Sequence, residues 1–139
     1  MVEWIEFTET YVLAAMPSDV KLAYAAWIAA HVDKAGRLEE IAGQVLADFR
    51  SGLSANPYME LDDDETTLIE RCVPHALTIV IYHLMLEMGL PVNMSAQTAF
   101  NNAQVYLRRL YISDERLDGE GAGSPSYETE IEREARVLA

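Results

Sequence analysis

The amino-acid sequence predicts an all-α protein, a small bundle of about four to five helices followed by an extended acidic C-terminal tail. Three observations support this fold class. Apolar side chains recur at intervals of three and four residues in several segments, as they do along one face of an α-helix. Glycine and proline separate these segments. Half of the 139 residues are apolar, which is enough for one hydrophobic core.

Residues 1–17 are expected to form an N-terminal arm and a short helix. Val2, Trp4 and Phe7 alternate with acidic residues, which is typical of an extended segment. Ile5 is out of phase with this alternation, so a helix start fits the region equally well. Thr8 then provides a cap for a short helix that ends at a proline.

A helical domain is expected over residues 18–112. Its first helix begins at Ser18 and ends near Gly36, and its second is expected to end at Gly52, where a left-handed backbone conformation costs glycine nothing. The predicted buried face of the first helix comprises Val20, Ala23, Tyr24, Trp27, Ile28 and His31. That of the second comprises Leu38, Ile41, Ala42, Val45, Leu46 and Phe49. The polar residues expected on its other side are Glu39, Glu40, Gln44 and Asp48.

A polar loop is expected over residues 53–63, because Asn-Pro and clustered aspartates favour turns. A third helix should then run from Asp64 to Met88, with acidic residues in its first turn, where their negative charge interacts favourably with the positive end of the helix dipole. Pro74 leaves two alternatives. Either the helix kinks there, or one segment ends at Val73 and a new helix begins with Pro74 in its first turn. A helix beyond Pro74 would be apolar on nearly every face, which predicts that it is the central helix of the bundle.

Gly89 is expected to end this central helix, and Ser95 to cap the fourth. Arg108 and Arg109, the only adjacent basic pair in the chain, are predicted to face outward. They are candidates for contact with a phosphate or an acidic partner, or they simply face solvent and local acids. The predicted buried stripe of the fourth helix comprises Ala96, Ala99, Phe100, Ala103, Leu107 and Leu110.

Residues 113–139 are expected to form a flexible linker and a docking tail. The glycine-rich stretch 118–125 contains no apolar side chain larger than alanine, so it cannot fold on its own. A last short helix is expected after it, and isolated helices shorter than about 12–15 residues are marginal in water. We therefore expect a partner surface to order this tail. The candidate partner-binding residues are its thin apolar stripe, Tyr127, Ile131, Ala135 and Leu138.

Composition limits the environment and the partners. The 23 acidic and 10 basic residues give a formal net charge of −13, which repels polyanions and argues against tight wrapping of nucleic acid. The single cysteine, Cys72, cannot form an intrachain disulfide, so a reducing compartment fits best. The acidic N-terminus does not resemble a signal peptide. The apolar stretch 76–88 is shorter than the roughly 20 residues that cross a bilayer.

No set of residues predicts catalysis, and we expect no enzyme activity, no cofactor and no metal. Cys72 precedes His75 by three residues, but a buried structural cysteine is the preferred interpretation. His83 and Glu87 are four residues apart on one helical face, a spacing that can bind a metal, with His75 on a related face. Zinc needs three or four convergent ligands, so a hydrogen-bonded histidine is preferred. The acidic run 62–65 lacks the pattern of a calcium-binding loop.

Three segments together carry a family resemblance. They are Leu-Ala-Asp-Phe-Arg-Ser-Gly-Leu at 46–53 with Asn-Pro-Tyr at 56–58, Val-Pro-His-Ala-Leu-Thr-Ile-Val-Ile-Tyr-His-Leu at 73–84, and Asn-Ala-Gln-Val-Tyr-Leu-Arg-Arg-Leu at 102–110. In this order they resemble the head-tail connector, or adaptor, proteins of tailed phages, including the Mu-like prophage version. The resemblance covers about residues 35–112 and rests on layout more than on individual residues.

The resemblance implies a virion protein that forms a ring, commonly of about twelve copies, in the virion neck. Such a ring joins the portal protein at the capsid vertex to a downstream neck or tail protein, and it is assembled in the cytoplasm of the bacterial host. The resemblance also implies a subunit that lines the DNA channel without binding DNA specifically. An acidic surface suits a channel through which DNA must slide, and a weakly folding tail suits docking onto a portal.

Two other classes of function stay open. One is a small acidic helical regulator or packaging factor that binds other proteins, in the manner of a DNA mimic; acids spaced like phosphates on one face would favour it. The other is a metal-dependent helical enzyme, which requires further ligands to converge with His83 and Glu87.

Overall fold

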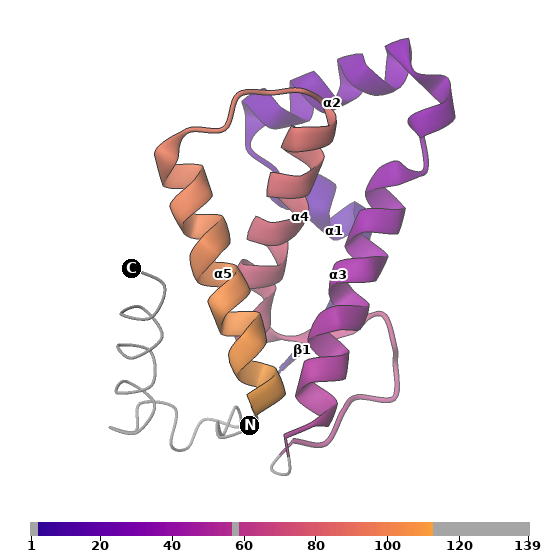
Figure 1. The fold of residues 1–139 in the computed structure, drawn as a ribbon. Helices are drawn as coiled ribbons and strands as arrows, with labels where there is room; N and C mark the ends of the chain where they lie inside the picture. The colour runs from indigo at the N-terminus through magenta and orange to yellow at the C-terminus, as the bar shows by residue number, and fades with distance from the viewer. Residues whose placement is uncertain (1–2, 57–58, 113–139) are drawn as a thin grey trace.

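The computed structural model describes residues 3–56 and 59–112, which form a mostly helical bundle with a small two-stranded sheet (Figure 1). The all-α prediction is confirmed for these residues. The predicted tail, with Tyr127, Ile131, Ala135 and Leu138, lies outside them. In chain order the elements are β1 (Trp4–Glu6), α1 (Glu9–Ala15), α2 (Ser18–Ala30), the 3-10 turn η1 (Val32–Lys34), α3 (Arg37–Ser54), β2 (Thr67–Ile69), the 3-10 turn η2 (Glu70–Cys72), α4 (Val73–Glu87) and α5 (Met94–Ile112).

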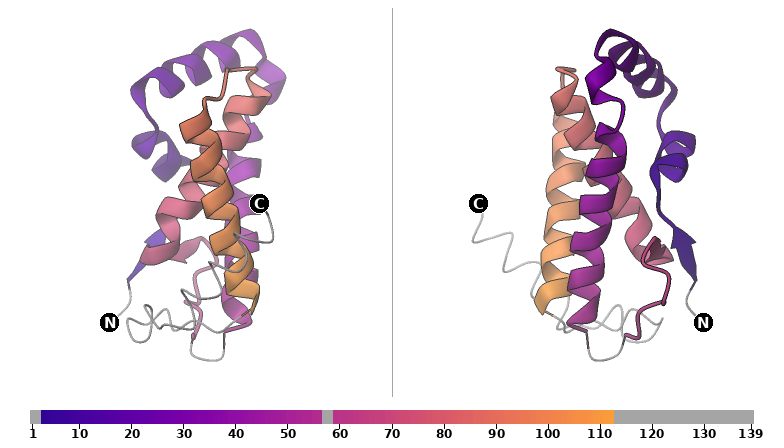
Figure 2. Two further views of the ribbon diagram at one scale, coloured as in Figure 1. Left: turned by 60° about the vertical axis from the view of Figure 1, so that its left-hand side comes forward. Right: turned by 90° about the vertical axis from the view of Figure 1, so that its right-hand side faces the viewer.

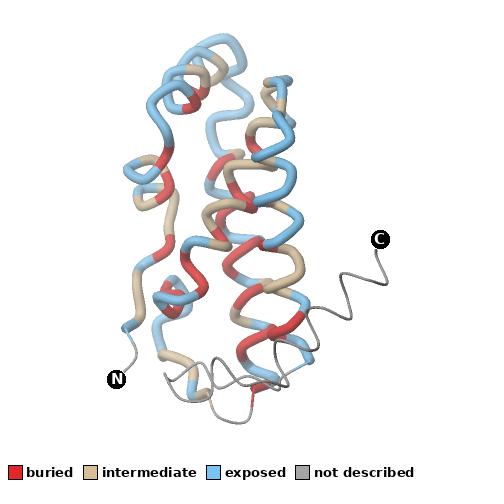
Figure 3. The backbone as a smooth tube through the Cα atoms, turned by 90° about the vertical axis from the view of Figure 1, so that its left-hand side faces the viewer, coloured by how far each residue is buried: buried red, intermediate tan, exposed pale blue. Residues whose placement is uncertain are grey.

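Helices α3, α4 and α5 pack against one another and form the main body of the molecule. β1 and α1 lie on the other side of α4 from α5 (Figure 2). Buried positions are concentrated where these parts face each other, whereas the end of the molecule formed by α2 is largely exposed (Figure 3). The largest side chains with almost no exposed surface are Phe7, Phe49, Leu38, Leu53, Leu68, Ile69 and Leu84. None of the helices in the described parts of the chain is long and apolar enough to cross a membrane.

The N-terminal residues form a strand, which settles the alternatives that their sequence left open. β1 pairs with β2 in antiparallel register, with Trp4 opposite Ile69 and Glu6 opposite Thr67. The prediction of a helix from Asp64 onward is therefore wrong for the first part of that segment. All three residues of β2 are buried, and three residues are too few to show the period of a helix or a strand. The strand also depends on a partner more than sixty positions away in the sequence.

In the turn before β2, the Asp64 carboxylate binds a neighbouring residue, whereas the acidic residues here were predicted to begin a helix. The Asp64 carboxylate accepts hydrogen bonds from the Thr66 backbone N–H (3.0 Å) and hydroxyl (2.7 Å), and these bonds lower the pKa of Asp64. Arg50 of α3 then donates to the backbone carbonyls of Asp62 and Thr67, at 2.6 Å each. The segment that replaces the expected first helical turns is thus fixed to α3 by one guanidinium group.

Helix α4 begins at Val73 with Pro74 in its first turn, which confirms the second alternative for the helix start. Its end also agrees with the prediction, because Gly89 has a positive φ of 74°. The next cap differs: the Asn93 side-chain oxygen accepts a 2.8 Å hydrogen bond from the Ala96 N–H, so Asn93 takes the place expected for Ser95.

Gly52 does not end α3, contrary to the prediction. The helix continues to Ser54, and the buried Gly52 lies against α5. A Cβ atom at this position would come within 2.9 Å of the Leu110 Cβ and 3.3 Å of the Tyr111 ring. The glycine therefore permits close approach of two helices.

Two of the predicted helix faces need correction. In α2 only Val20 and Tyr24 are buried, because the helix crosses the end of the bundle at which α4 finishes and α5 begins (Figure 1). In α5, Ala99 is exposed, whereas Arg109, which was expected to face outward, is only 4% exposed. The helix rotation that buries Ala103 and Leu110 also turns Arg109 inward.

Candidate functional site

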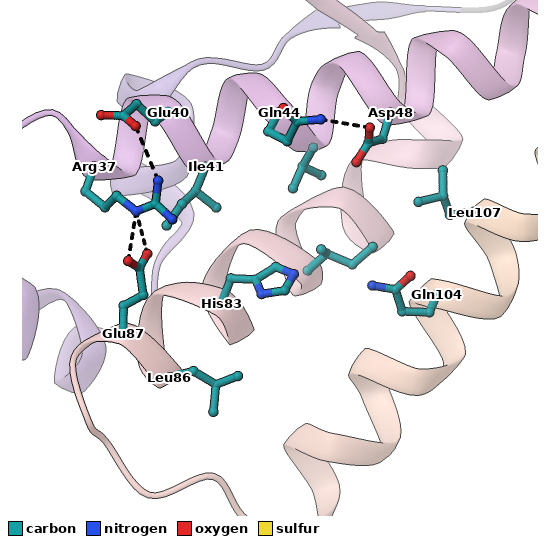
Figure 4. A pocket seen from close by; sticks show the side chains of 12 residues that line it. Arg37, Glu40, Ile41, Gln44, Asp48, His83, Leu86, Glu87, Gln104 and Leu107 are labelled. Carbon is teal, nitrogen blue, oxygen red and sulfur yellow. Dashed lines mark hydrogen bonds and ion pairs between the residues drawn. The ribbon is translucent and has the colours of Figure 1, made fainter.

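A groove runs along the face on which α3 and α5 flank α4 (Figure 4). It encloses a volume of about 810 Å³ and is open to solvent. Its apolar lining comes from all three helices and comprises Ile41, Val45, Ile79, Leu86 and Leu107. Seven polar side chains complete the lining, and Ile41, Val45 and Ile79 are themselves buried, so Leu86 and Leu107 supply most of its accessible apolar surface. A concave surface of this size is a candidate binding surface.

The α3 side of the groove carries a line of polar side chains. Arg37, Glu40, Gln44 and Asp48 follow one another at intervals of three or four residues, so they share one face of the helix. Gln44 Nε2 donates a 3.0 Å hydrogen bond to the Asp48 carboxylate. With Glu87 on the opposite side, one cation and three carboxylates leave the rim with two net negative charges.

An ion pair closes one end of the groove. Arg37 Nε donates to both carboxylate oxygens of Glu87 at 2.8 Å, and Arg37 Nη1 lies 3.3 Å from Glu40 (Figure 4). The hydrogen bond with Glu87 raises the pKa of Arg37. These charged groups are exposed to solvent, where salt screens them, so a partner can displace the pair without disturbing the core.

The structure places His83 and Glu87, the predicted metal-binding pair, in this groove but gives them different partners. The His83 ring packs edge-on against Phe100, with ring centroids 5.5 Å apart, and Glu87 binds Arg37. His75, the third candidate, lies away from the groove and stacks on Tyr106 with ring centroids 3.9 Å apart. Within residues 3–56 and 59–112, no three or more His, Cys, Asp or Glu side chains form a group that could hold a metal ion.

Cys72 is buried, as the preferred interpretation of the sequence held. Burial raises the pKa of its thiol to about 12, and the sulfur lies 3.9 Å from the Tyr106 hydroxyl. Burial also lowers the pKa of His75, whose ring packs against the same tyrosine. A thiol that is both inaccessible and protonated at neutral pH is a poor nucleophile.

Arg108 and Arg109 do not form a joint basic surface. Arg108 is exposed on α5, whereas Arg109 is buried in the bundle. Of this predicted pair, only Arg108 is placed where a phosphate or an acidic partner could reach it. The other candidate partner-binding residues belong to the tail, outside the described residues.

The sequence analysis missed an apolar surface on α2 and η1, which we call the α2–η1 segment (residues 18–34). Leu22 is 73% exposed and Val32 is 78% exposed, although both are large apolar residues. Trp27 and Ile28 are only partly covered by the core. A signal was present, because Leu22 and Val32 fall outside the predicted buried face while remaining apolar. Large apolar side chains that stay exposed on one short segment are candidates for an interaction surface.

Comparison of the chain with models of known protein families, with curated proteins and with solved structures finds no match.

Proposed function

We propose that this chain is a structural subunit of a tailed-phage neck, a ring-forming adaptor between the portal and the tail. The observation that carries the proposal is the exposed apolar character of the α2–η1 segment. Leu22 and Val32 gain nothing from the fold of one chain, so burial against another molecule would stabilise their association by the hydrophobic effect. A subunit whose role is assembly needs a surface of this kind.

The acidic groove gives the chain a second surface of different shape and charge. Two unlike surfaces on one chain are what a heterologous ring requires, because each contact joins a different patch on each of two neighbours. The net charge of −13 suits a ring through which DNA passes without adhering. The order of the three motif segments, described above, supports the same class of protein.

The partner proteins test the proposal. We expect the tagged full-length chain, purified from its native source, to bring down portal and tail components, as identified by mass spectrometry. Deletion of residues 124–139 should abolish attachment to the portal while leaving the thermal melting of the helical domain unchanged. Unchanged attachment would refute the role of the tail. Recovery of a transcription factor, nuclease or metabolic enzyme in place of virion proteins would refute the adaptor and favour an acidic regulator.

A further inference from the structure

We propose that the α2–η1 segment of one copy binds the α3–α4–α5 groove of a second copy, so that the chains associate head to tail. The biological setting of this contact rests on the proposed function, but the contact itself is argued from two described surfaces. One is apolar and protrudes at the end of the bundle; the other is concave and lies along its side (Figures 1 and 4).

The two surfaces of one chain cannot meet each other. On α3, Arg37, Ile41 and Gln44 face the groove, whereas Glu39, Ala42 and Leu46 line a hollow with the start of α1. At about 100° per residue these two sets lie on opposite sides of the helix. β1 and α1 thus anchor the beginning of the α2–η1 segment on the far side of α3 (Figure 2).

The end of the segment is restrained as well. Only Ala35 and Gly36 separate η1 from α3, and three Cα–Cα steps reach about 11 Å. The groove follows α3 from Arg37 to Asp48, which is about 16 Å of helix. A short connection at one end and an anchored α1 at the other keep the segment out of its own groove. A second copy has no such restraint.

Charge favours this pairing over other self-contacts. A chain with a net charge of −13 opposes its own association wherever acidic surfaces meet. Both lysines of the chain, Lys21 and Lys34, lie in the α2–η1 segment and balance its two aspartates, so the segment is neutral. The groove rim carries two net negative charges. Asp19 and Lys21 both lie beside Leu22 on α2, so docking Leu22 into the groove would bring an ammonium group together with a carboxylate, and not carboxylates alone, to the acidic rim.

The surfaces also match in chemistry. Leu22 and Val32 need an apolar receptor, and the exposed Leu86 and the partly buried Leu107 provide one between polar walls. Apolar anchors inserted into a groove with a charged rim are the usual anatomy of a specific interface. Because the donor and receptor surfaces differ, repetition of the contact gives either a closed ring or a filament.

The test uses two variants of the full chain, each of which damages one surface at an exposed side chain. L22E places an acid against the acidic groove, and L86R places a charged side chain in the apolar lining that Leu22 should enter. Leu86 is 51% exposed at the groove, so both variants should fold, which circular dichroism can check. I112E is the matched control, since Ile112 is an exposed apolar residue outside both surfaces.

In sedimentation velocity, we expect the wild type and I112E to self-associate with rising concentration, and each of the other two variants to need at least about tenfold higher concentration. An equimolar mixture of L22E and L86R should associate at a lower concentration than either variant alone, because the intact segment of L86R can bind the intact groove of L22E. This recovery would also show that both variants are folded.

Three results would overturn the proposal: a wild type that stays monomeric up to its solubility limit, a mixture that does not pair, or a loss of association in L22E that L86R does not share. The last result would place the α2–η1 segment on some other surface. Portal capture by a monomeric wild type would refute this contact while supporting the proposed function, so the two failures are distinguishable.

Discussion

Replacement of Gly52 by alanine tests whether α3 and α5 are held at the distance that the structure shows. In an ordinary helix interior this change stabilises the protein by about 0.5–1 kcal/mol, because alanine loses less conformational entropy than glycine. At Gly52 the new methyl group would lie 2.9 Å from the Leu110 Cβ, which is attached directly to the backbone of α5. The methyl can fit only if the two helices move apart, and overpacking of this kind costs about 1–3 kcal/mol.

Gly43 provides the matched control, because it lies in the same helix and a Cβ there would meet nothing within 4 Å. The helix-propensity gain is common to both variants, so the difference between G43A and G52A isolates the packing cost of about 1–3 kcal/mol. With a urea m-value of about 2 kcal/mol/M, the two unfolding midpoints should differ by about 0.5–1.5 M, G52A being the less stable. Equal midpoints would refute the close crossing of α3 and α5.

Two further predictions concern the buried Cys72 and the half-buried His75, which both lie against Tyr106. At pH 8, Cys72 should react with a thiol-specific reagent at least about a hundredfold more slowly in the folded protein than in urea. The reason is that its thiol is buried and its pKa is raised to about 12. Comparable rates would contradict this burial. Burial lowers the pKa of His75 from its ordinary 6.5, so at acidic pH the unfolded chain binds more protons than the folded chain. The stability that this group contributes is therefore present above pH 6.5 and is lost as the pH falls through the folded pKa. H75Q should therefore flatten the decline of the urea midpoint below pH 6.5, and an unchanged decline would show that His75 is not its source.

Sequence periodicity succeeded where a helix faces a core along its whole length. In α3, the six positions predicted to be buried are all buried, because an amphipathic spacing of three and four residues reports one continuous face. It failed in the segment that forms β2, where the structure depends on pairing with β1. A three-residue strand has too few positions to show an alternation, and its partner is distant in the sequence.

The groove was beyond the reach of the same reasoning for a different reason. Glu40, Gln44 and Asp48 were correctly predicted to face away from the buried stripe, yet a helical pattern cannot say whether the outward side faces open solvent or a neighbouring helix. That depends on the angle at which α5 approaches α3. Gly52, which permits this approach, was visible in the sequence, but the same residue fits a helix end equally well.

The location of the lysines reconciles the acidity of the chain with the proposed self-association. At physiological ionic strength, repulsion between exposed charges is largely screened beyond about 8–10 Å, so acidic surfaces that stay apart oppose association only weakly. Charges brought together within a contact are not screened in this way, and there the sign of each group matters. In the proposed contact, a segment whose two lysines balance its two aspartates faces a rim with excess carboxylate, so the repulsion there is smaller than between two acidic surfaces. The rest of the surface can then remain strongly acidic, as the proposed DNA channel requires, without preventing the proposed contact between two copies.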